Sequence, residues 1–255
     1  MSSLADAYSA GATAWADGPA LVYRRLAELL VEFSPVPLTG RRVLDHGSGT
    51  GVGSAAALAA DARVIATDIA PGMLGFDRTA RPPSAAGDAL ALPFRSNAFD
   101  VVLAAFSLNH FDDPATALRE ARRVAPVVIA STYAEDDDHP AKHAVDSALA
   151  AHGWSTPPWY SQLKAAMRLW GTVDAAAAVI ERAGLDPIKI ERVEIEFDQL
   201  RPDDLITWRL GMAQTAPYFA ELDRDTQQDV RRRARDLLAL NAEPLVRRVI
   251  FLAAT

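Results

Sequence analysis

The glycine-rich segment VLDHGSGTGVGS, residues 43–54, has the residue types and spacing that point most directly to ligand binding. Two apolar residues suited to a buried strand lead into Asp45, and Gly47, Gly49 and Gly51 follow at alternate positions. Glycine lets the backbone turn sharply and approach a ligand closely, because it has no Cβ. The helical pattern that follows places free backbone N–H groups and the positive end of a helix dipole at this loop. The loop is therefore predicted to bind a molecule with an anionic end.

Two further acids are placed where a nucleoside would need them. Asp68 ends the apolar stretch VIATD, about 20 residues after the glycine loop, and Asp88 lies in GDALALPF. A carboxylate at the first position can accept hydrogen bonds from both ribose hydroxyls, and one at the second from an adenine amino group. The fingerprint of dinucleotide-binding loops, G-x-G-x-x-G or A, has Gly or Ala at the position of Val52. The loop therefore does not specifically indicate a dinucleotide. Each acid alone is typical of a loop or cap, but three at strand ends favour a nucleoside site.

Alternating strand and helix patterns are expected to position these residues. The strand-like stretches are RRVLDH, ARVIATDI, SAAGDA, FDVVLAAF and PVVIAST, with helical patterns between them. Near-continuous apolar strands of this kind form a parallel sheet covered on both faces, an α/β doubly wound, Rossmann-like fold. In such sheets ligands bind at the carboxyl ends of the strands.

The pattern predicts a single domain over residues 1–255, in which two insertions interrupt the core. Such insertions commonly carry specificity. The expected parts are an N-terminal helical cap (1–40), a cofactor-binding core (41–133), lid or acceptor insertions (134–170 and 199–244), and the remaining core (171–198 and 245–255).

Composition narrows the class of protein. Half of the 255 residues are hydrophobic, the net charge is −7, and there is no cysteine. No apolar stretch reaches about 18 residues and the first residues lack a secretory pattern, so a cytoplasmic protein without membrane association is expected. The acidic balance argues against nucleic acid as a partner. No metal site is expected, although the acids of residues 135–138 with His139 and His143 offer a divalent cation as an alternative to a solvated helix entrance.

On these motifs the sequence resembles the class I S-adenosylmethionine-dependent methyltransferases, and most closely the small-molecule branch (methyltransferase type 11) similar to ubiquinone and menaquinone methyltransferases. The matching stretches are VLDHGSGTGVGS, ATDIAPGML, GDALALPF, NAFDVVLAAFSLNHFDDPATALREARRV and AAVIERAGL. The resemblance implies a seven-stranded sheet with LVRRVIFLAA as its antiparallel last strand. It also implies S-adenosylmethionine as cofactor and S-adenosylhomocysteine as product.

The resemblance further implies a role for individual residues. The glycine loop and Asp45 would surround the methionine part of the cofactor, Asp68 would bind the ribose, and Asp88 with Ala89 would frame the adenine. Ile69, Met73 and Leu90 would flank the adenine ring or, alternatively, belong to the core, and Phe106 is also expected to contact the cofactor. Two departures stand out: His46 replaces the usual apolar residue, and the turn after ARRV is shortened to APVVIAS.

The reaction itself places modest demands on the protein. The methyl group is already activated on a sulfonium, so the main tasks are alignment and exclusion of water. A base is needed only where the acceptor must lose a proton. His110, in FSLNHF after the fourth predicted strand, is the candidate catalytic base, and the alternative is a histidine that packs beside the next helix.

Aromatic residues outside the core motifs are candidates for binding the acceptor. Trp154, Trp159 and Tyr160 lie in the insertion GWSTPPWYSQLKAAMRLW and either line an apolar acceptor pocket or pack a lid on the sheet. In similar enzymes the N-terminal segment, here with Tyr8 and Trp15, closes over the site, and Tyr8 is expected to contact substrate.

The expected activity is methyl transfer to O, N or C of a small, partly apolar metabolite, for instance in secondary metabolism. The fourth strand lacks the Asn-Pro-Pro-Tyr type of motif found in enzymes that methylate proteins and bases. The alternatives are an RNA or protein methyltransferase, and a cyclase or binding protein of the same fold that transfers no methyl group. A monomer or a homodimer is expected.

Overall fold

A seven-stranded sheet forms the centre of the computed structural model, which describes residues 4–240 and 243–255. Its strand order is β3-β2-β1-β4-β5-β7-β6. The strands are β1 (Arg42–His46), β2 (Arg63–Asp68), β3 (Ser84–Ala86), β4 (Val101–Ala105), β5 (Val127–Tyr133), β6 (Pro187–Phe197) and β7 (Leu245–Ala254). Strands β1 to β5 pair in parallel, and β7 runs antiparallel to both β5 and β6. The predicted doubly wound α/β fold with an antiparallel last strand is confirmed.

Alternation along the strands separates two hydrophobic layers. On β4, Val101 and Leu103 belong to one buried cluster, whereas Val102 and Ala104 belong to the other. The first layer packs against α3 (Ala20–Glu32) and α4 (Val52–Ala59), and the second against α6 (Pro114–Val124) and α9 (Val173–Arg182). Both faces of the central strands are thus buried, which explains their continuous apolar sequence.

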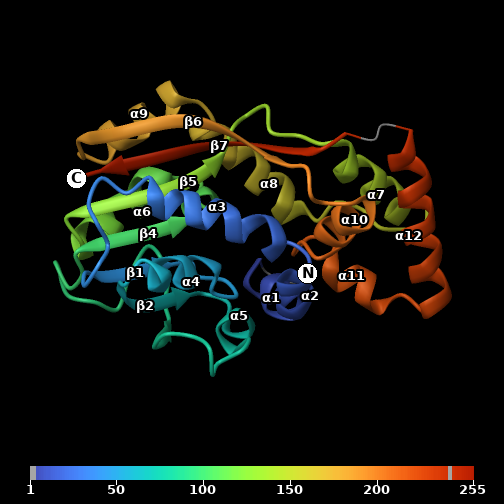
Figure 1. Cartoon of the computed structure of the whole chain (residues 1–255), viewed down its shortest axis with the longest axis horizontal. Coiled ribbons are helices and arrows are strands. Elements are labelled where there is room, and N and C mark those ends of the chain that lie inside the picture. The colour runs from blue at the N-terminus through green and yellow to red at the C-terminus, as the bar shows by residue number, and fades with distance from the viewer. Residues whose placement is uncertain (1–3, 241–242) are drawn as a thin grey trace.

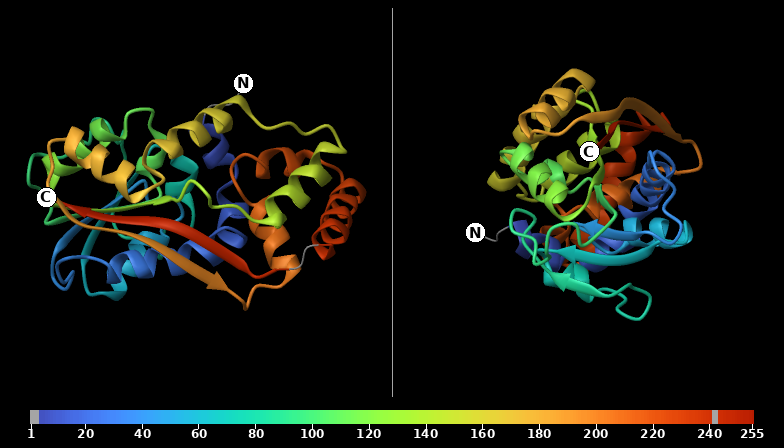
Figure 2. Two further views of the ribbon diagram at one scale, coloured as in Figure 1. Left: turned by 90° about the horizontal axis from the view of Figure 1, so that it is seen from above. Right: turned by 90° about the vertical axis from the view of Figure 1, so that its left-hand side faces the viewer.

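The two insertions meet in a helical lobe beyond the carboxyl ends of the strands. Helix α7 (Pro140–Ala150), from the first insertion, packs against α10 (Pro202–Leu210) and α12 (Arg224–Ala239), from the second. Helices α8 (Pro158–Met167) and α11 (Ala216–Glu221) complete the lobe. Figures 1 and 2 show the sheet at one end of the long axis and this lobe at the other.

The N-terminal helices lie between the sheet and the lobe (Figure 1). Helix α1 (Leu4–Ala10) contacts α5 (Pro71–Gly75), and α2 (Ala12–Asp17) contacts α3 and α10. At the first contact the Gly72 amide donates to Ser9 Oγ at 3.2 Å, and a Cβ on Gly72 would lie 2.4 Å from the Ser9 carbonyl oxygen. The first two helices therefore cover the strand ends. Among the described residues, no helix is long and apolar enough to span a membrane.

Candidate active site

A cavity of about 490 Å³ lies at the carboxyl ends of β1, β2, β4 and β5, where the sheet meets the helical lobe. Its wall includes the glycine loop, the N-terminal helices, the 3₁₀ turn η1 (Leu108–His110), α8, and the segment between α10 and α11. Parallel strands direct their carboxyl ends to the same edge, so residues from distant parts of the sequence meet here.

The glycine loop after β1 has a backbone conformation that favours glycine, and at one of its positions a side chain would clash with a neighbouring residue. Gly47, Gly49 and Gly51 all have positive φ, the region that glycine adopts without steric cost. A Cβ on Gly47 would lie 2.4 Å from Ser107 Cβ, whereas within the described residues one on Gly49 would meet nothing inside 4 Å. Gly47 thus permits close packing of β1 against β4, and Gly49 exposes bare backbone on the cavity wall.

Asp45 holds the start of α4 from beneath the loop. Its side chain is buried, and its Oδ2 accepts a hydrogen bond from Ser54 Oγ at 2.6 Å. Gly53 allows this approach, because a Cβ there would lie 2.8 Å from Asp45 Oδ1. Burial raises the pKa of Asp45 to about 6, against the lowering effects of Ser54 and Arg81. The residue lines the cavity, as its predicted role requires.

Asp68 fixes the outer side of the glycine loop. Its Oδ2 accepts from the Gly49 amide at 2.7 Å and its Oδ1 from the Ala70 amide at 2.8 Å. Burial raises the pKa of Asp68, and the two amide bonds oppose that shift. Each carboxylate oxygen retains a second lone pair, so the group is oriented for two further donors such as ribose hydroxyls.

Arg81 clamps the same loop, and the sequence reasoning missed it. Its Nη1 donates to the carbonyl oxygens of Gly49 and Met73, both at 2.7 Å, and its Nη2 donates to Ser48 Oγ at 2.8 Å. An arginine in an irregular segment before a strand carries no local signal for such a contact. The loop is therefore held from both sides, by Asp68 and by Arg81.

The end of the cavity near β2 and β3 has the residues expected around an adenine. Ile69, Met73, Asp88 and Ala89 line it, and the Ile69 side chain is 53% exposed despite being apolar. Asp88 Oδ1 accepts from the Leu90 amide at 2.9 Å, which leaves the second carboxylate oxygen for a ligand. An exposed apolar side chain on a cavity wall suits a flat, weakly polar ring. Leu90 itself is not among the described residues that line the cavity.

His46 links two strand ends beneath the loop. Its Nδ1 lies 3.0 Å from Ser107 Oγ, in hydrogen-bond contact, and the ring is buried. Burial lowers the pKa of His46 to about 4, so the imidazole is neutral at pH 7. His46, which stands where the family usually has an apolar residue, is thus a packed residue that joins β1 to the segment after β4.

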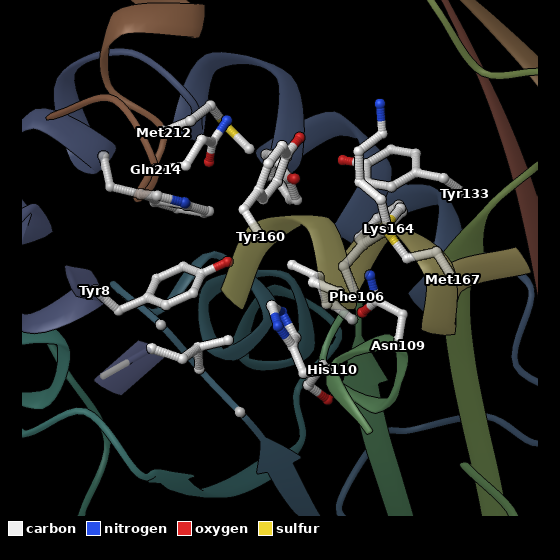
Figure 3. Close-up of a pocket in the computed structure, with 18 of the residues that line it drawn as sticks. Tyr8, Phe106, Asn109, His110, Tyr133, Tyr160, Lys164, Met167, Met212 and Gln214 are labelled. Atoms are coloured by element: carbon white, nitrogen blue, oxygen red, sulfur yellow. The ribbon is translucent and has the colours of Figure 1, made fainter. Parts of the chain in front are cut away.

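His110 lies in η1 and lines the cavity below Tyr8 in the view of Figure 3. Its ring meets the Tyr8 ring edge to face, with centroids 5.6 Å apart and an interplanar angle of 80°. Burial lowers the pKa of His110 to about 4, with the Phe106 backbone opposing the shift. A neutral imidazole and a tyrosine hydroxyl therefore share one wall, and both were predicted as site residues.

Phe106 belongs to an aromatic cluster that the sequence did not predict. It has a φ of 57°, uncommon outside glycine, and its amide donates to Ser131 Oγ at 3.1 Å. Its ring centroid lies 4.5 Å from that of Tyr133 and 5.2 Å from that of Tyr23. All three rings line the cavity, and the backbone conformation of Phe106 turns the chain from β4 toward η1.

The predicted aromatic insertion divides between the cavity and the interior. Tyr160 lines the cavity, but neither Trp154 nor Trp159 is among the described residues that do. Trp154 is buried, and its Nε1 donates to the Gln214 carbonyl oxygen at 3.2 Å. Trp159 packs edge to face on Tyr160 at 5.8 Å. The expectation that both tryptophans line an acceptor pocket is therefore corrected. They support the lobe, and Tyr160 faces the cavity.

Ion pairs occupy the acidic run that offered a metal site. Asp137 pairs with Arg247 at 2.8 Å and with Lys142 at 3.0 Å. His139 caps α7 by accepting from the Ala141 amide, and His143 contacts Asp138 at 2.7 Å. The described residues contain no group of three or more acids and histidines arranged to hold a metal ion.

The chain is similar to known proteins over the region that contains these motifs. Residues 44–126 match the family model described as a methyltransferase domain. The chain is 33% identical over 162 residues to the demethylmenaquinone methyltransferase of Corynebacterium kroppenstedtii, covering 58% of this chain and 69% of the relative. It is 30% identical over 180 residues to that of Streptomyces griseus, covering 66% and 76%.

A solved structure shares the fold. Phosphoethanolamine N-methyltransferase 2 of Haemonchus contortus, in complex with phosphomonomethylethanolamine and S-adenosylhomocysteine, aligns with a TM-score of 0.59 at 20% identity. The alignment covers 100% of this chain and 60% of that protein.

The fold and the site define an α/β enzyme that binds a nucleoside cofactor at the ends of its parallel strands. The chain belongs to the class I S-adenosylmethionine-dependent methyltransferases, as the sequence resemblance predicted. Its cofactor is S-adenosylmethionine. The cavity provides the bare backbone at Gly49 and the oriented carboxylate of Asp68 that such a cofactor needs. The roles of individual residues stay predictions.

Proposed function

We propose that the protein methylates an oxygen atom of a small, partly apolar acceptor held beside His110. The single observation that carries the proposal is the position of this neutral histidine, on the cavity wall with its ring against that of Tyr8. The curated relatives named above are called demethylmenaquinone methyltransferases, and that name specifies a quinone, a small molecule, as their acceptor.

The cofactor half of the proposal assigns one task to each strand end. Asp68 accepts the ribose hydroxyls, Asp88 the adenine amino group, and the glycine loop accommodates the methionine part. When bound, S-adenosylmethionine supplies a methyl group activated by its sulfonium. The protein contributes orientation, because Asp68 and Arg81 fix the loop before any ligand enters.

The acceptor half places a hydroxyl group against His110. A neutral imidazole can accept a hydrogen bond from that hydroxyl and so orient its oxygen lone pair. A base with a pKa of about 4 is too weak to ionise a free alcohol or phenol beforehand. It is sufficient once the oxygen becomes alkylated, because a protonated ether oxygen is strongly acidic. His110 would then receive the proton late, as the new bond forms.

The pKa of His110 also bears on which atom is methylated. An alkylated amine keeps its extra proton at neutral pH, since ammonium groups have pKa values near 10. A histidine with a pKa of about 4 offers no advantage to such an acceptor. Oxygen therefore suits this site better than an amine nitrogen does.

The size and wall of the cavity support a small acceptor. Its volume of about 490 Å³ falls in the range of small-molecule sites, and the cofactor has to share this space with the acceptor. On the lobe side Tyr160 and Met167 from α8 and Met212 from the segment after α10 face Phe106 and Tyr133 (Figure 3). Aromatic and thioether side chains contact flat apolar molecules well.

The test is transfer of labelled methyl groups. The protein is incubated with methyl-labelled S-adenosylmethionine and a metabolite extract, and the label is followed into small molecules, protein and RNA. Label in a small product whose new methyl group is bonded to oxygen, as determined by NMR of the product, supports the proposal. Label on nitrogen, in protein or in RNA contradicts it, and binding of the cofactor without any transfer would favour a non-transferring member of the fold.

A further inference from the structure

Two clusters of charge line the lobe side of the cavity; the charges of the first balance, and those of the second do not. In the first, Arg209 of α10 donates to Asp146 of α7 through Nε at 2.8 Å and Nη2 at 2.6 Å. This pair has one cation for one carboxylate. In the second, the Asp137 carboxylate is shared by Arg247 and Lys142, so two cations face one carboxylate.

The geometry of the second cluster shows how its donors are used. Arg247 binds Asp137 through Nε at 3.0 Å and Nη2 at 2.8 Å, and its Nη1 takes no part in the pair. Lys142 Nζ donates to the backbone oxygen and the Oδ2 of Asp137, both at 3.0 Å, and an ammonium has a third donor. Both cations therefore retain donors while they line the cavity.

Neighbouring acids do little to cancel the remaining charge. Asp138 Oδ1 lies 3.6 Å from Lys142 Nζ, but that side chain is 57% exposed and also contacts His143. Water screens such a pair strongly. The side chains of Asp137 and Arg247 are each only 3% exposed and that of Lys142 is 19% exposed. Among the described residues, no second buried carboxylate contacts Lys142 or Arg247.

Aromatic rings connect this cluster to the proposed reaction centre. The Arg247 guanidinium lies over the Tyr133 ring at 4.3 Å and beside the Trp208 ring at 5.0 Å. Tyr133 in turn packs on Phe106, and its buried hydroxyl lies in hydrogen-bond reach of Tyr23. Tyr133 points from β5 into the cavity, on the side away from His110 (Figure 3).

We propose that the acceptor carries an anionic oxygen group, a carboxylate or a phosphate, which binds at Lys142 and Arg247 beside the Tyr133 hydroxyl. This inference rests on the proposed function, because it describes the far end of the same acceptor. The body of the acceptor lies against Phe106 and Tyr133, and the hydroxyl to be methylated faces His110. The anionic group supplies the charge that Asp137 alone cannot balance for two cations. The pKa of Lys142, which burial and the charge of Arg247 lower to about 8, is consistent with excess positive charge here.

The test uses the full-length protein saturated with S-adenosylhomocysteine and three simple probes: benzoate, phenyl phosphate and the neutral benzyl alcohol. Dissociation constants are measured by ligand-observed NMR. The structure predicts that at least one anionic probe binds about tenfold or more tightly than benzyl alcohol, as expected for charge-assisted hydrogen bonds. Tighter binding of benzoate than of phenyl phosphate indicates a carboxylate, and the reverse order indicates a phosphate. Equal binding of all three probes, or binding of neither anion, overturns the inference.

Lys142→Gln is the decisive variant. It removes the surplus cation and leaves the Asp137–Arg247 pair intact, so the lobe is expected to stay folded. The preference for the anionic probe should disappear, while affinities for benzyl alcohol and S-adenosylhomocysteine stay within about twofold. Lys142→Arg, which keeps the charge, should restore much of the preference. The matched control is Lys189→Gln, a lysine exposed on β6 and outside the cavity, which should change nothing.

Other outcomes separate the two proposals. An unchanged anion preference in K142Q overturns the inference, and so does an equal loss for benzyl alcohol, which would indicate a purely structural role. An equal effect of K189Q would indicate long-range charge rather than a site and also overturns it. If label is transferred only to nitrogen while K142Q behaves as expected, the anion site stands and the proposed oxygen methylation fails.

Discussion

The Gly49 amide and the Asp68 carboxylate, 2.7 Å apart, join the glycine loop to the end of β2. One residue gives the loop its bare backbone, and the other is the expected ribose ligand. Loop conformation and ribose binding therefore depend on the same carboxylate. A defect in Asp68 should thus affect two parts of the cofactor together.

Replacement of Asp68 by alanine is expected to weaken S-adenosylmethionine binding by roughly 1.5–3 kcal/mol, the range for lost hydrogen bonds to a charged group. Calorimetry on the variant and the wild type measures the difference. Asp225→Ala, in the first turn of α12 and outside the cavity, is the control. Unchanged affinity in Asp68→Ala would remove this residue from the ribose site.

Replacement of His110 by alanine is expected to lower kcat by about 100-fold while the cofactor still binds, the lower range for loss of a proton acceptor. In the wild type, kcat should fall as the pH drops below about 4, because burial lowers the pKa of His110 to about 4 and the protonated ring cannot accept a proton. Rapid-quench measurements of product formation with pH provide the test. A loss below about threefold would indicate positioning alone.

Protein stability should depend on pH through His46. Its folded pKa of about 4 lies below the unfolded value of 6.5, so between these pH values the unfolded chain binds more protons. Its contribution to stability is therefore complete above about pH 6.5 and lost as pH falls toward 4. Going from pH 7.5 to 4.5, wild type should lose about 2 kcal/mol more unfolding free energy than His46→Gln. Urea titrations at both pH values measure this, and parallel losses would contradict it.

The corrected positions of the aromatic side chains predict different effects for two neighbours on α8. Tyr160→Ala should raise the acceptor KM, because this ring lines the cavity and its hydroxyl lies 3.4 Å from Arg209 Nη1. Trp159→Ala should act mainly on thermal stability of the lobe. Steady-state kinetics with the identified acceptor and a thermal melt separate the effects. A larger KM change for Trp159→Ala would restore the original prediction for that tryptophan.

Turnover is expected to be independent of added metal. The carboxylates of the acidic run are engaged in pairs, Asp137 with Arg247 and Lys142, and Asp136 with Arg192 at 2.8 Å. A divalent ion would have to displace these cations. Activity assays after chelation and dialysis should match untreated enzyme. If magnesium restored an activity that chelation had abolished, this run would have to be reinterpreted as a metal site.

Short-range sequence patterns were enough to predict the residues on the cofactor side of the site. The alternation of glycines at 47, 49 and 51 and the acids at the ends of apolar strands are short-range patterns, and parallel strands necessarily bring such ends together. Local signals also mark the start of α6, which has Pro114 in its first turn and is capped by Asp113, whose side chain accepts from the Ala115 amide at 3.2 Å. The sequence by itself therefore determined the fold class and the sheet edge at which the predicted cofactor residues lie together.

The acceptor side was decided only by tertiary structure. Trp159 and Tyr160 are adjacent in sequence, yet consecutive helical residues point about 100° apart, so the rotation of α8 determines which of them faces the cavity. Arg247 pairs with Asp137, a residue 110 positions earlier, because the antiparallel pairing of β7 with β5 brings the two together. Neither the rotation of a lid helix nor a pairing over that distance is encoded in local pattern, because both are set by packing of the whole lobe.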